Sequence, residues 1–563
     1  MNHMSKKLEF SFKVLILILF LLIIYSCFYI LDRGFEITDE AYYLLLAKYS
    51  DSSTLYISMQ HWVMNGLWKV SNSITAFRSL GMLILVLSSS VLAYGIISIL
   101  EKLNIQIKTY FYKVLIIISA IATSLLYGET INFSPSYNLL AASGAYFAAG
   151  FILLSINTTD TLKKNLLYIA VAFSLTVEFL SKPSSGIATM VLILLLSLYF
   201  EKRNTVKISI VIFIFCIFFI FSFLFLNTTF EEAKFAIKNG FELFRIVQSE
   251  PVYNRLMRNY TEIYNFSYDA IKIHLYLVIS IFVYVFYRKV IAIFIVLFAL
   301  VYTVYSNDYF VLVSKNLVLQ MQFLYIILFL SIVVSFSEIR KNKNLLVILF
   351  LLILLPFTVA IGSGNHIFTQ IIISLASWGV LISTIVGINF QRVADTLMVK
   401  FLSLCFIIFV TIQMVLNLYR IPYHMVTPYI KQSNIVNLGE LGYLKVDLET
   451  KQFIDNLEST KNICKIPSNI HFFGLYNIPG VALALDAIPP VSPWLNNIEQ
   501  AEYILKYFDT SKESFIVGVQ LRNGHIPSLP YTFEPYKNNF KYCGTVIYPY
   551  SKQKIQIWWS NAK

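Results

Sequence analysis

Long apolar runs recur along this chain of 563 residues, and each is close to the roughly 20 residues that a helix needs to cross a bilayer. Hydrophobic residues make up 57% of the chain and charged residues only 13%, which excludes a soluble globular fold. The sequence therefore predicts a polytopic α-helical membrane protein with about thirteen spans. The runs cover residues 14–31, 80–100, 114–127, 139–156, 166–180, 187–200, 206–226, 273–287, 290–305, 317–336, 345–361, 368–388 and 401–419.

Basic residues occupy every second loop between these runs, as they do in cytoplasmic loops. The alternation predicts a cytoplasmic N-terminus in the plasma or inner membrane and, with an odd number of spans, an external C-terminal segment. The first run has no small-residue cleavage site after it, so we expect a retained helix and not a signal peptide. The net charge of +13 is then a topology signal, and no nucleic-acid partner is needed to explain it.

Three stretches are long enough to form structure outside the bilayer: residues 32–78, residues 227–272, and everything after about 420. The first two are amphipathic, which is typical of helices that lie on a membrane surface and contact its lipids. The third predicts a small α/β domain of soluble type over 421–563, after a membrane domain over 1–420. Its expected strands are "NIHFFGLY", "GVALALD" and "SFIVGVQL", and its expected helices are "DLETKQFIDNLEST" and "NNIEQAEYILKYFD".

Two of the five cysteines, Cys464 and Cys543, fall in the segment predicted to be exported. That compartment is oxidising enough for a disulfide. The sequence leaves the pairing open, because it does not show whether the two residues come within reach of each other.

Two adjacent carboxylates, Asp39 and Glu40, follow the first apolar run in "GFEITDEAYYLLLAKY". One interpretation is a helix cap, in which Thr38 or Asp39 is the N-cap and the acids favour the helix dipole. The other is function, since carboxylates held close to hydrocarbon are costly unless they are paired or used.

The order of these features resembles the GT-C superfamily of membrane glycosyltransferases, and within it the lipid A aminoarabinose transferases and the protein O-mannosyltransferases. The resemblance covers the whole architecture: a first span, an outer loop that opens with "ITDEAYY", about thirteen spans, and an exported α/β domain. It implies transfer of a sugar from a polyprenyl-phosphate donor to a lipid, glycan or protein hydroxyl on the outer face, with inversion. By this analogy Asp39 is the general base, and Glu40 orients it or binds the acceptor.

Further site residues are expected in the other outer loops. Glu129 in "LLYGETINFSPSYN" is a second carboxylate that could face the site, and Tyr137 and Asn138 could contact sugar hydroxyls. Lys182 in "FLSKPSSG" is the first candidate for binding the donor phosphate, because Pro183 and Gly186 predict a bent backbone beside it. Further candidates are His61 and His366 for acceptor or sugar, and Lys315, Arg255 and Arg258 for phosphate.

Each of these residues also has a structural interpretation, as a solvated loop acid, a lysine at a helix end, or a basic group that meets anionic lipid. A divalent cation could bridge Asp39, Glu129 and the phosphate, but no ligand cluster requires one. No other cofactor is indicated, since no nucleotide-binding, zinc or serine-elbow motif is present.

Two other functions remain open. A polysaccharide polymerase or ligase also joins lipid-linked sugars, but it would more naturally place its chemistry in late loops. A transporter or lipid flippase would carry ionisable residues at mid-membrane on broken helices in repeated halves. The strongest acid within a span here is Glu178, a few residues from the outer edge, and no convincing repeat is visible.

Overall fold

The computed structural model describes most of the chain. The described residues are 2–200, 205–225, 228–246, 252–287, 290–307, 309, 317–388, 393–508, 514–521 and 529–560. Statements about side chains are limited further, because a few residues inside these ranges, Arg255 among them, have undescribed side chains.

Within the described residues, nine helices are long and apolar enough to cross a membrane, and eleven if each of two bent pairs counts as one span. The bent pairs are α11 with α12, at 76°, and α16 with α17, at 64°. Two shorter apolar stretches, Ser209–Phe223 and Ile291–Ser306, match the two remaining predicted runs. The prediction of a polytopic helical membrane protein is confirmed. The nine helices are α1 (Asn2–Ile30), α4 (Ile74–Lys102), α5 (Tyr110–Ser124), α6 (Tyr137–Asn157), α7 (Thr161–Ser181), α8 (Pro183–Phe200), α14 (Leu317–Ile339), α15 (Lys343–Ala360) and α18 (Val393–Asn417).

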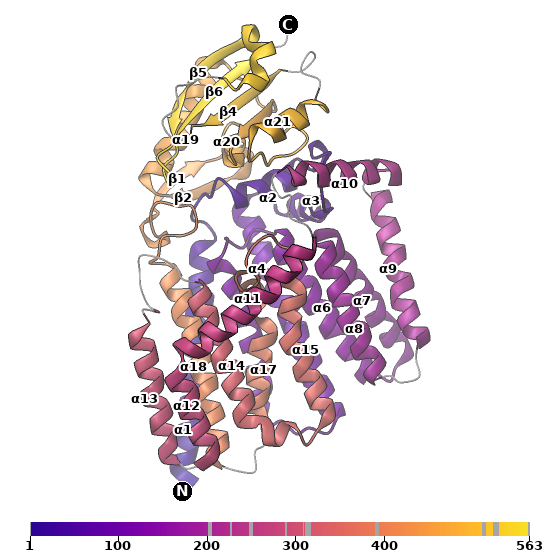
Figure 1. The fold of residues 1–563 in the computed structure, drawn as a ribbon, viewed down its shortest axis with the longest axis vertical. Coiled ribbons are helices and arrows are strands. Elements are labelled where there is room, and N and C mark those ends of the chain that lie inside the picture. The colour runs from indigo at the N-terminus through magenta and orange to yellow at the C-terminus, as the bar shows by residue number, and fades with distance from the viewer. Residues whose placement is uncertain are drawn as a thin grey trace.

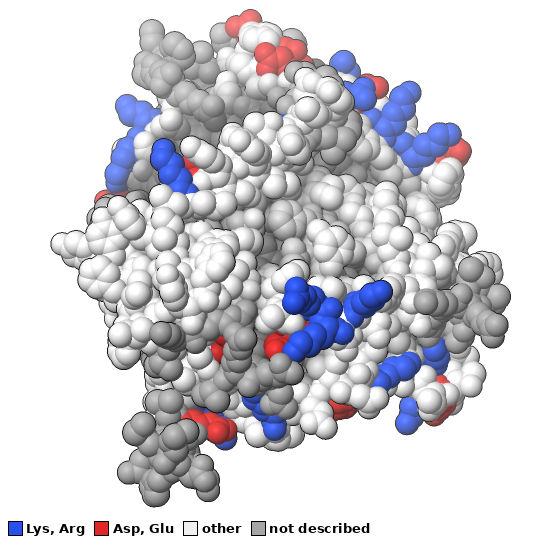
Figure 2. All heavy atoms as spheres, turned by 60° about the horizontal axis from the view of Figure 1, so that its bottom comes forward, with Lys and Arg blue, Asp and Glu red and all other residues white. Residues whose placement is uncertain are grey.

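These helices stand side by side in a bundle, with the N-terminus at one end and the C-terminal domain on the other (Figure 1). The bundle is held by close packing as well as by apolar side chains: at the crossing of α4 and α6, a Cβ on Gly95 would lie 2.6 Å from the carbonyl oxygen of Gly150. Figure 2, which brings the lower end forward, shows Lys and Arg side chains in a few patches on a surface otherwise largely without charge.

Two short helices lie between the bundle and the C-terminal domain: α2 (Asp39–Lys48) and α3 (Gln60–Ser71) (Figure 1). In the second outer stretch, α10 (Phe230–Arg245) begins with a capping box between Thr229 and Glu232. The helix α11 (Val252–Ile273) then slants across the front of the bundle and packs on α14 and α16 (Ile367–Ile371). The remaining apolar helices are α9 (Thr205–Phe225), α12 (Leu275–Tyr287), α13 (Val290–Ser306) and α17 (Ala376–Gly387).

The C-terminal domain contains a four-stranded sheet in the order β3-β4-β6-β5, where β3 (His471–Leu475) runs parallel to β4 (Phe515–Gln520). The strand β6 (Lys554–Ser560) is antiparallel to β4 and to β5 (Phe540–Ile547). A separate hairpin joins β1 (Asn434–Asn437) to β2 (Tyr443–Val446). The helices are α19 (Leu448–Cys464), α20 (Pro479–Ala484) and α21 (Ile498–Leu505).

One predicted strand is wrong, because residues 480–486 lie largely in helix α20. Pro479 occupies the first helical position, where its missing N–H costs nothing. Gly480 then packs against the segment before α2: its N–H donates to the carbonyl of Ile37 at 2.8 Å, and a Cβ would lie 2.5 Å from the Ile37 Cα. The contact of Gly480 with Ile37 therefore determines that this segment is a helix, although its alternating apolar residues are typical of a strand.

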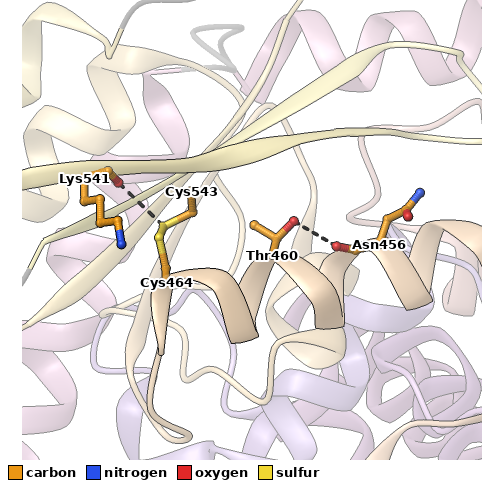
Figure 3. Close-up of a disulfide and its surroundings, with 5 residues drawn as sticks. All are labelled: Asn456, Thr460, Cys464, Lys541 and Cys543. Atoms are coloured by element: carbon orange, nitrogen blue, oxygen red, sulfur yellow. Dashed lines mark hydrogen bonds between the residues drawn. A yellow bond between two sulfur atoms is a disulfide. The ribbon is translucent and has the colours of Figure 1, made fainter.

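The pairing of Cys464 and Cys543, left open by the sequence, is given by the fold. Cys464 ends α19 and Cys543 lies on β5, and the two form a disulfide with Cα atoms 5.6 Å apart (Figure 3). The bond fixes the helix to the strand it packs on, across 79 residues of sequence.

Candidate active site

The first turn of α2 is capped by Glu36 and not by the residues that the sequence suggested. The Thr38 side chain makes no capping hydrogen bond. Instead, Glu36 Oε1 accepts the Thr38 N–H at 2.7 Å, and Glu36 Oε2 accepts the Glu40 N–H at 2.8 Å. The cap is therefore supplied from outside the "TDE" motif, and the carboxylate of Asp39 is not required for it.

Asp39 is half-buried beside polar groups from the end of the membrane domain. Burial and the nearby Glu36 carboxylate raise the pKa of its carboxyl, His424 and a hydrogen bond from Tyr423 oppose the shift, and the resulting pKa is about 6. A carboxyl with this pKa is about nine-tenths deprotonated at pH 7 and is a better proton acceptor than an ordinary aspartate. Asp39 therefore has the properties of a general base.

The segment that contacts Asp39 is held by its own network. The Nδ1 atom of His424 lies 2.8 Å from Thr38 Oγ1 and 3.4 Å from Glu36 Oε1. The rings of Tyr423 and His424 stack at 3.7 Å, and Tyr548 of the C-terminal domain donates to the His424 carbonyl at 3.1 Å. Residues more than 380 positions apart thus share one polar cluster around the first turn of α2.

Glu40 points the other way, into a fully buried ion pair with Arg78. The guanidinium donates to both carboxylate oxygens at 2.7 Å, and Ser134 donates to Oε1 at 2.6 Å. Because both oxygens of this carboxylate already accept hydrogen bonds, Glu40 has little capacity left to bind an acceptor substrate. The geometry supports a positioning role, in which Glu40 fixes the start of α2 against α4 and so fixes the backbone beside Asp39.

Glu129, at the end of a 3-10 turn over Leu125–Glu129, is buried and lines a small pocket. The same pocket is lined by Glu36 and Tyr423, which also surround Asp39, so the two predicted carboxylates lie on neighbouring parts of one site. Arg420 interacts electrostatically with Glu129, which opposes the lowering of the Arg420 pKa by burial. The guanidinium also donates to Gln413 Oε1 at 2.6 Å.

The predicted phosphate ligand Lys182 lies buried between α7 and α8, where it meets two other predicted residues. Its ammonium donates to Asn138 Oδ1 at 3.3 Å and to the Val359 carbonyl at 2.8 Å, and it lies 5.5 Å from the ring centroid of Tyr137. The ring of Tyr137 in turn lies 6.0 Å from that of Tyr43 on α2. Asp39 and Lys182 are thus linked through two tyrosines.

The second outer stretch reaches this region through the loop at 361–366. Arg258 on α11 lies 3.7 Å from Glu262, whose carboxylate accepts the Ile367 N–H at 2.9 Å and lies 3.8 Å from His366. The same loop contacts the lysine side, since Ser184 donates to the Ile361 carbonyl at 3.2 Å. Arg258 and His366 therefore border the Lys182 group, whereas the Arg255 side chain and all of Lys315 lie outside the described residues.

His61 lies apart from both clusters, in the first turn of α3. Its ring is buried 4.5 Å from that of Tyr56, and burial lowers its pKa to about 3, so it is neutral. Gln60 Oε1, His61 Nε2 and Trp62 Nε1 are buried atoms with no hydrogen-bond partner among the described residues. Nothing in the described structure connects this row of polar atoms to Asp39.

Several residues of the site were not predicted: Glu36, Arg78, Arg420, Tyr423 and His424. Glu36 lies three residues before Asp39, and Arg78 lies in the second turn of α4 just before the second predicted run, so both had a local signal in their position at the membrane edge. The segment "RIPYH" at 420–424 was assigned to a domain boundary. Its Arg, Tyr and His immediately after an apolar run were the signal that could have identified it.

No group of three or more His, Cys, Asp or Glu side chains that could hold a metal ion occurs within the described parts of the chain. The predicted cation between Asp39 and Glu129 therefore stays a prediction.

The fold and the site define a class: a multi-pass membrane protein with a C-terminal α/β domain on one end of its helical bundle, a half-buried carboxylate at Asp39 and a buried lysine at Lys182. Among solved structures, the chain is similar to ArnT from Cupriavidus metallidurans, a lipid A aminoarabinose transferase, in its apo state, with 8% identity and a TM-score of 0.45 over 97% of this chain and 98% of that one. It is also similar to the same protein bound to undecaprenyl phosphate, with 8% identity and a TM-score of 0.43 over 99% of both chains. No family model matches the sequence, and no curated protein matches it at a significant level. The structures belong to one of the two families that the sequence resembles.

Proposed function

We propose that this protein is a glycosyltransferase that moves a sugar from a polyprenyl-phosphate carrier to an acceptor hydroxyl on the outer face of the membrane. The observation that carries the proposal is the state of Asp39: a half-buried carboxylate with a pKa of about 6, freed from the helix cap by Glu36. The N-terminus lies in the cytoplasm, so the site and the C-terminal domain lie outside.

The reaction needs a base more than it needs an acid. A phosphate is a good leaving group once its charge is balanced, whereas a neutral hydroxyl is a poor nucleophile until it loses its proton. In the proposed step, the acceptor oxygen attacks the anomeric carbon and its proton passes to Asp39. The bond between the anomeric carbon and the phosphate oxygen breaks, its electron pair leaves with the polyprenyl phosphate, and attack from the opposite face inverts the configuration.

Lys182 is the group that we place on the donor phosphate. Its ammonium is buried and donates to two neutral acceptors, with the Glu178 carboxyl nearby, so a phosphate would add a full negative charge to its hydrogen-bond partners. Desolvation makes this attraction stronger than it would be at a surface. Tyr137 and Asn138, which contact Lys182, are placed to bind hydroxyls of the transferred sugar.

The test is lipid and glycan mass spectrometry on host cells that carry wild type, Asp39→Asn or no copy of the protein. We expect Asp39→Asn to reproduce the null strain, with a polyprenyl-phosphate sugar accumulating and one envelope component lacking one sugar. The matched control is Asp51→Asn, the same substitution at an exposed position in the same outer loop.

Membrane levels of the variants must be equal for the comparison to hold. If Asp39→Asn behaves as wild type at equal levels, Asp39 is not the base, and the observation that carries the transferase proposal is lost. A null strain that accumulates a whole lipid-linked polymer subunit would identify a polymerase or ligase. A null strain that fails to move a lipid across the membrane, with its sugars unchanged, would identify a transporter.

A further inference from the structure

Two loops of the C-terminal domain form a polar and aromatic cluster beside α2. Asn477 follows β3, and Trp494 and Asn496 lie between α20 and α21. Asn496 Oδ1 accepts hydrogen bonds from Asn477 Nδ2 at 2.6 Å and from Trp494 Nε1 at 3.1 Å. All three side chains are only half-buried, so the cluster is accessible as well as ordered.

The loops that carry this cluster are held in strained conformations. Tyr476, Asn477 and Val491 have φ of 71°, 63° and 51°, which is the left-handed region, and a β-branched residue such as valine rarely adopts it. The N–H groups of Tyr476 and Asn477 both donate to the Leu495 carbonyl, at 2.9 and 3.0 Å. Strain that the surrounding hydrogen bonds maintain is typical of binding and catalytic loops.

One hydrogen-bond acceptor atom in the cluster has no donor. The Oδ1 atom of Asn477 is itself buried, although the whole side chain is only half-buried, and it has no hydrogen-bond partner among the described residues. A buried carbonyl oxygen without a donor is costly, and a ligand hydroxyl could satisfy it.

The cluster contacts α2, the helix that begins at Asp39, through Tyr42. Tyr42 contacts the Trp494 ring edge-on at 5.4 Å, whereas its neighbour Tyr43 contacts Tyr137 of the lysine group. Tyr42 lies three residues after Asp39, which places both on one face of α2. The domain is fixed here by two backbone contacts: Gly480 donates to Ile37 at 2.8 Å, and Thr54 donates to Val491 at 3.0 Å.

We propose that Tyr42, Asn477, Trp494 and Asn496 form the acceptor subsite, and that the acceptor is a glycan. Amides with an unused acceptor suit sugar hydroxyls, and an aromatic face suits the apolar face of a sugar ring. A bare lipid would not satisfy the polar atoms. This inference rests on the proposed function, because it assigns the second substrate of the same site.

The experiment measures transfer by the full-length protein in membranes, with two probes extracted from cells that lack it: the accumulated donor lipid and the unmodified acceptor fraction. We expect Trp494→Ala and Asn477→Ala each to raise the KM for the acceptor fraction about tenfold, with the donor KM unchanged. Trp494→Phe, which keeps a ring and loses the N–H, should raise the acceptor KM less. Trp558→Ala, a half-buried tryptophan on β6, is the control and should leave both KM values at wild type.

An unchanged acceptor KM in Trp494→Ala and Asn477→Ala overturns the inference, and so does a raised donor KM. The chemical class is tested separately by mild periodate, which cleaves vicinal diols of sugars and leaves lipid chains intact. An oxidised fraction that remains a full acceptor overturns the assignment to a glycan. Wild type and Asp39→Asn are assayed in parallel. If the wild type transfers no sugar to the acceptor fraction, the proposed function fails. If the wild type transfers sugar, Asp39→Asn does not, and Trp494→Ala and Asn477→Ala keep the wild-type acceptor KM, only the subsite is wrong.

Discussion

Two buried cations flank the candidate active site, and they are bonded very differently. Arg78 directs its N–H groups to both oxygens of Glu40 and to the carbonyls of Leu31, Arg33 and Gly34, at 2.7 to 3.0 Å. Lys182 has two neutral acceptors, Asn138 and the Val359 carbonyl, for three N–H groups. A saturated buried charge stabilises the fold, whereas one with spare hydrogen-bonding capacity is available for a substrate.

The largest effect is expected at Arg78, the cation whose hydrogen bonds are all made within the protein. Arg78→Met leaves the Glu40 carboxylate buried without its cation, which should cost about 3–5 kcal/mol of the free energy of unfolding. Thermal unfolding of the purified protein checks this, together with its level in the membrane. The double variant Arg78→Met/Glu40→Gln should recover part of the loss. A single variant as stable as wild type would contradict the structural role of the pair.

Lys182→Met should affect activity more than stability. We expect a small change in the free energy of unfolding and a loss in the rate of sugar transfer of about 100-fold or more. The reason is that its hydrogen-bond acceptors are neutral, and the nearby Glu178 carboxyl keeps its hydrogen bonds from Ser185 and Thr189 when Lys182 is removed. Initial rates at saturating acceptor, compared with unfolding temperatures, separate the two effects. Lys163→Met, at an exposed position in the first turn of α7, is the matched control. Equal losses of stability and activity would make Lys182 a structural residue like Arg78.

The pH profile sharpens the comparison at Asp39. Transfer requires the deprotonated carboxylate, so kcat/KM should rise with pH through about 6 and level off above it. Tyr423→Phe removes a hydrogen bond that lowers the pKa of Asp39 and should move the rise to higher pH. Glu36→Gln removes a charge that raises this pKa and should move it to lower pH, each by about one unit or less. Shifts in the same direction would show that another group controls the profile.

The smallest effect is expected from Asn138→Ala. The hydrogen bond from Lys182 to Asn138 is long, at 3.3 Å, and the Val359 carbonyl remains as an acceptor after the change. Loss of one such bond should raise the donor KM about threefold to tenfold and leave kcat within a factor of a few. Titration with the donor lipid measures it. A loss as large as that of Lys182→Met would show that Asn138 itself contacts the reacting groups.

The sequence predicted what depends on composition and short range. Apolar length located the spans, and a carboxylate pair at the membrane edge located Asp39, because both are one-dimensional signals. It could not show that Glu36 caps α2. A cap by Thr38 or Asp39 and a cap by Glu36 both place acidic residues at the start of the helix, so the sequence pattern is the same for both. Nor could it show that Tyr423 and His424 meet Asp39, because that contact closes a loop of more than 380 residues. The helix α20 was missed because its contact with Ile37 outweighs a strand-like apolar alternation.

The docking of α20 on the segment before α2 has a consequence for biosynthesis. Asp39 follows the first span and is made early, whereas Tyr423 and His424 lie more than 380 residues later, and the Tyr548 that binds the His424 carbonyl lies later still. The base therefore waits for most of the synthesis without the groups that surround it. The polar cluster around Asp39 is complete only after the segment that supplies Tyr548 has been made and has folded, so an unfinished chain carries the carboxylate without its surroundings.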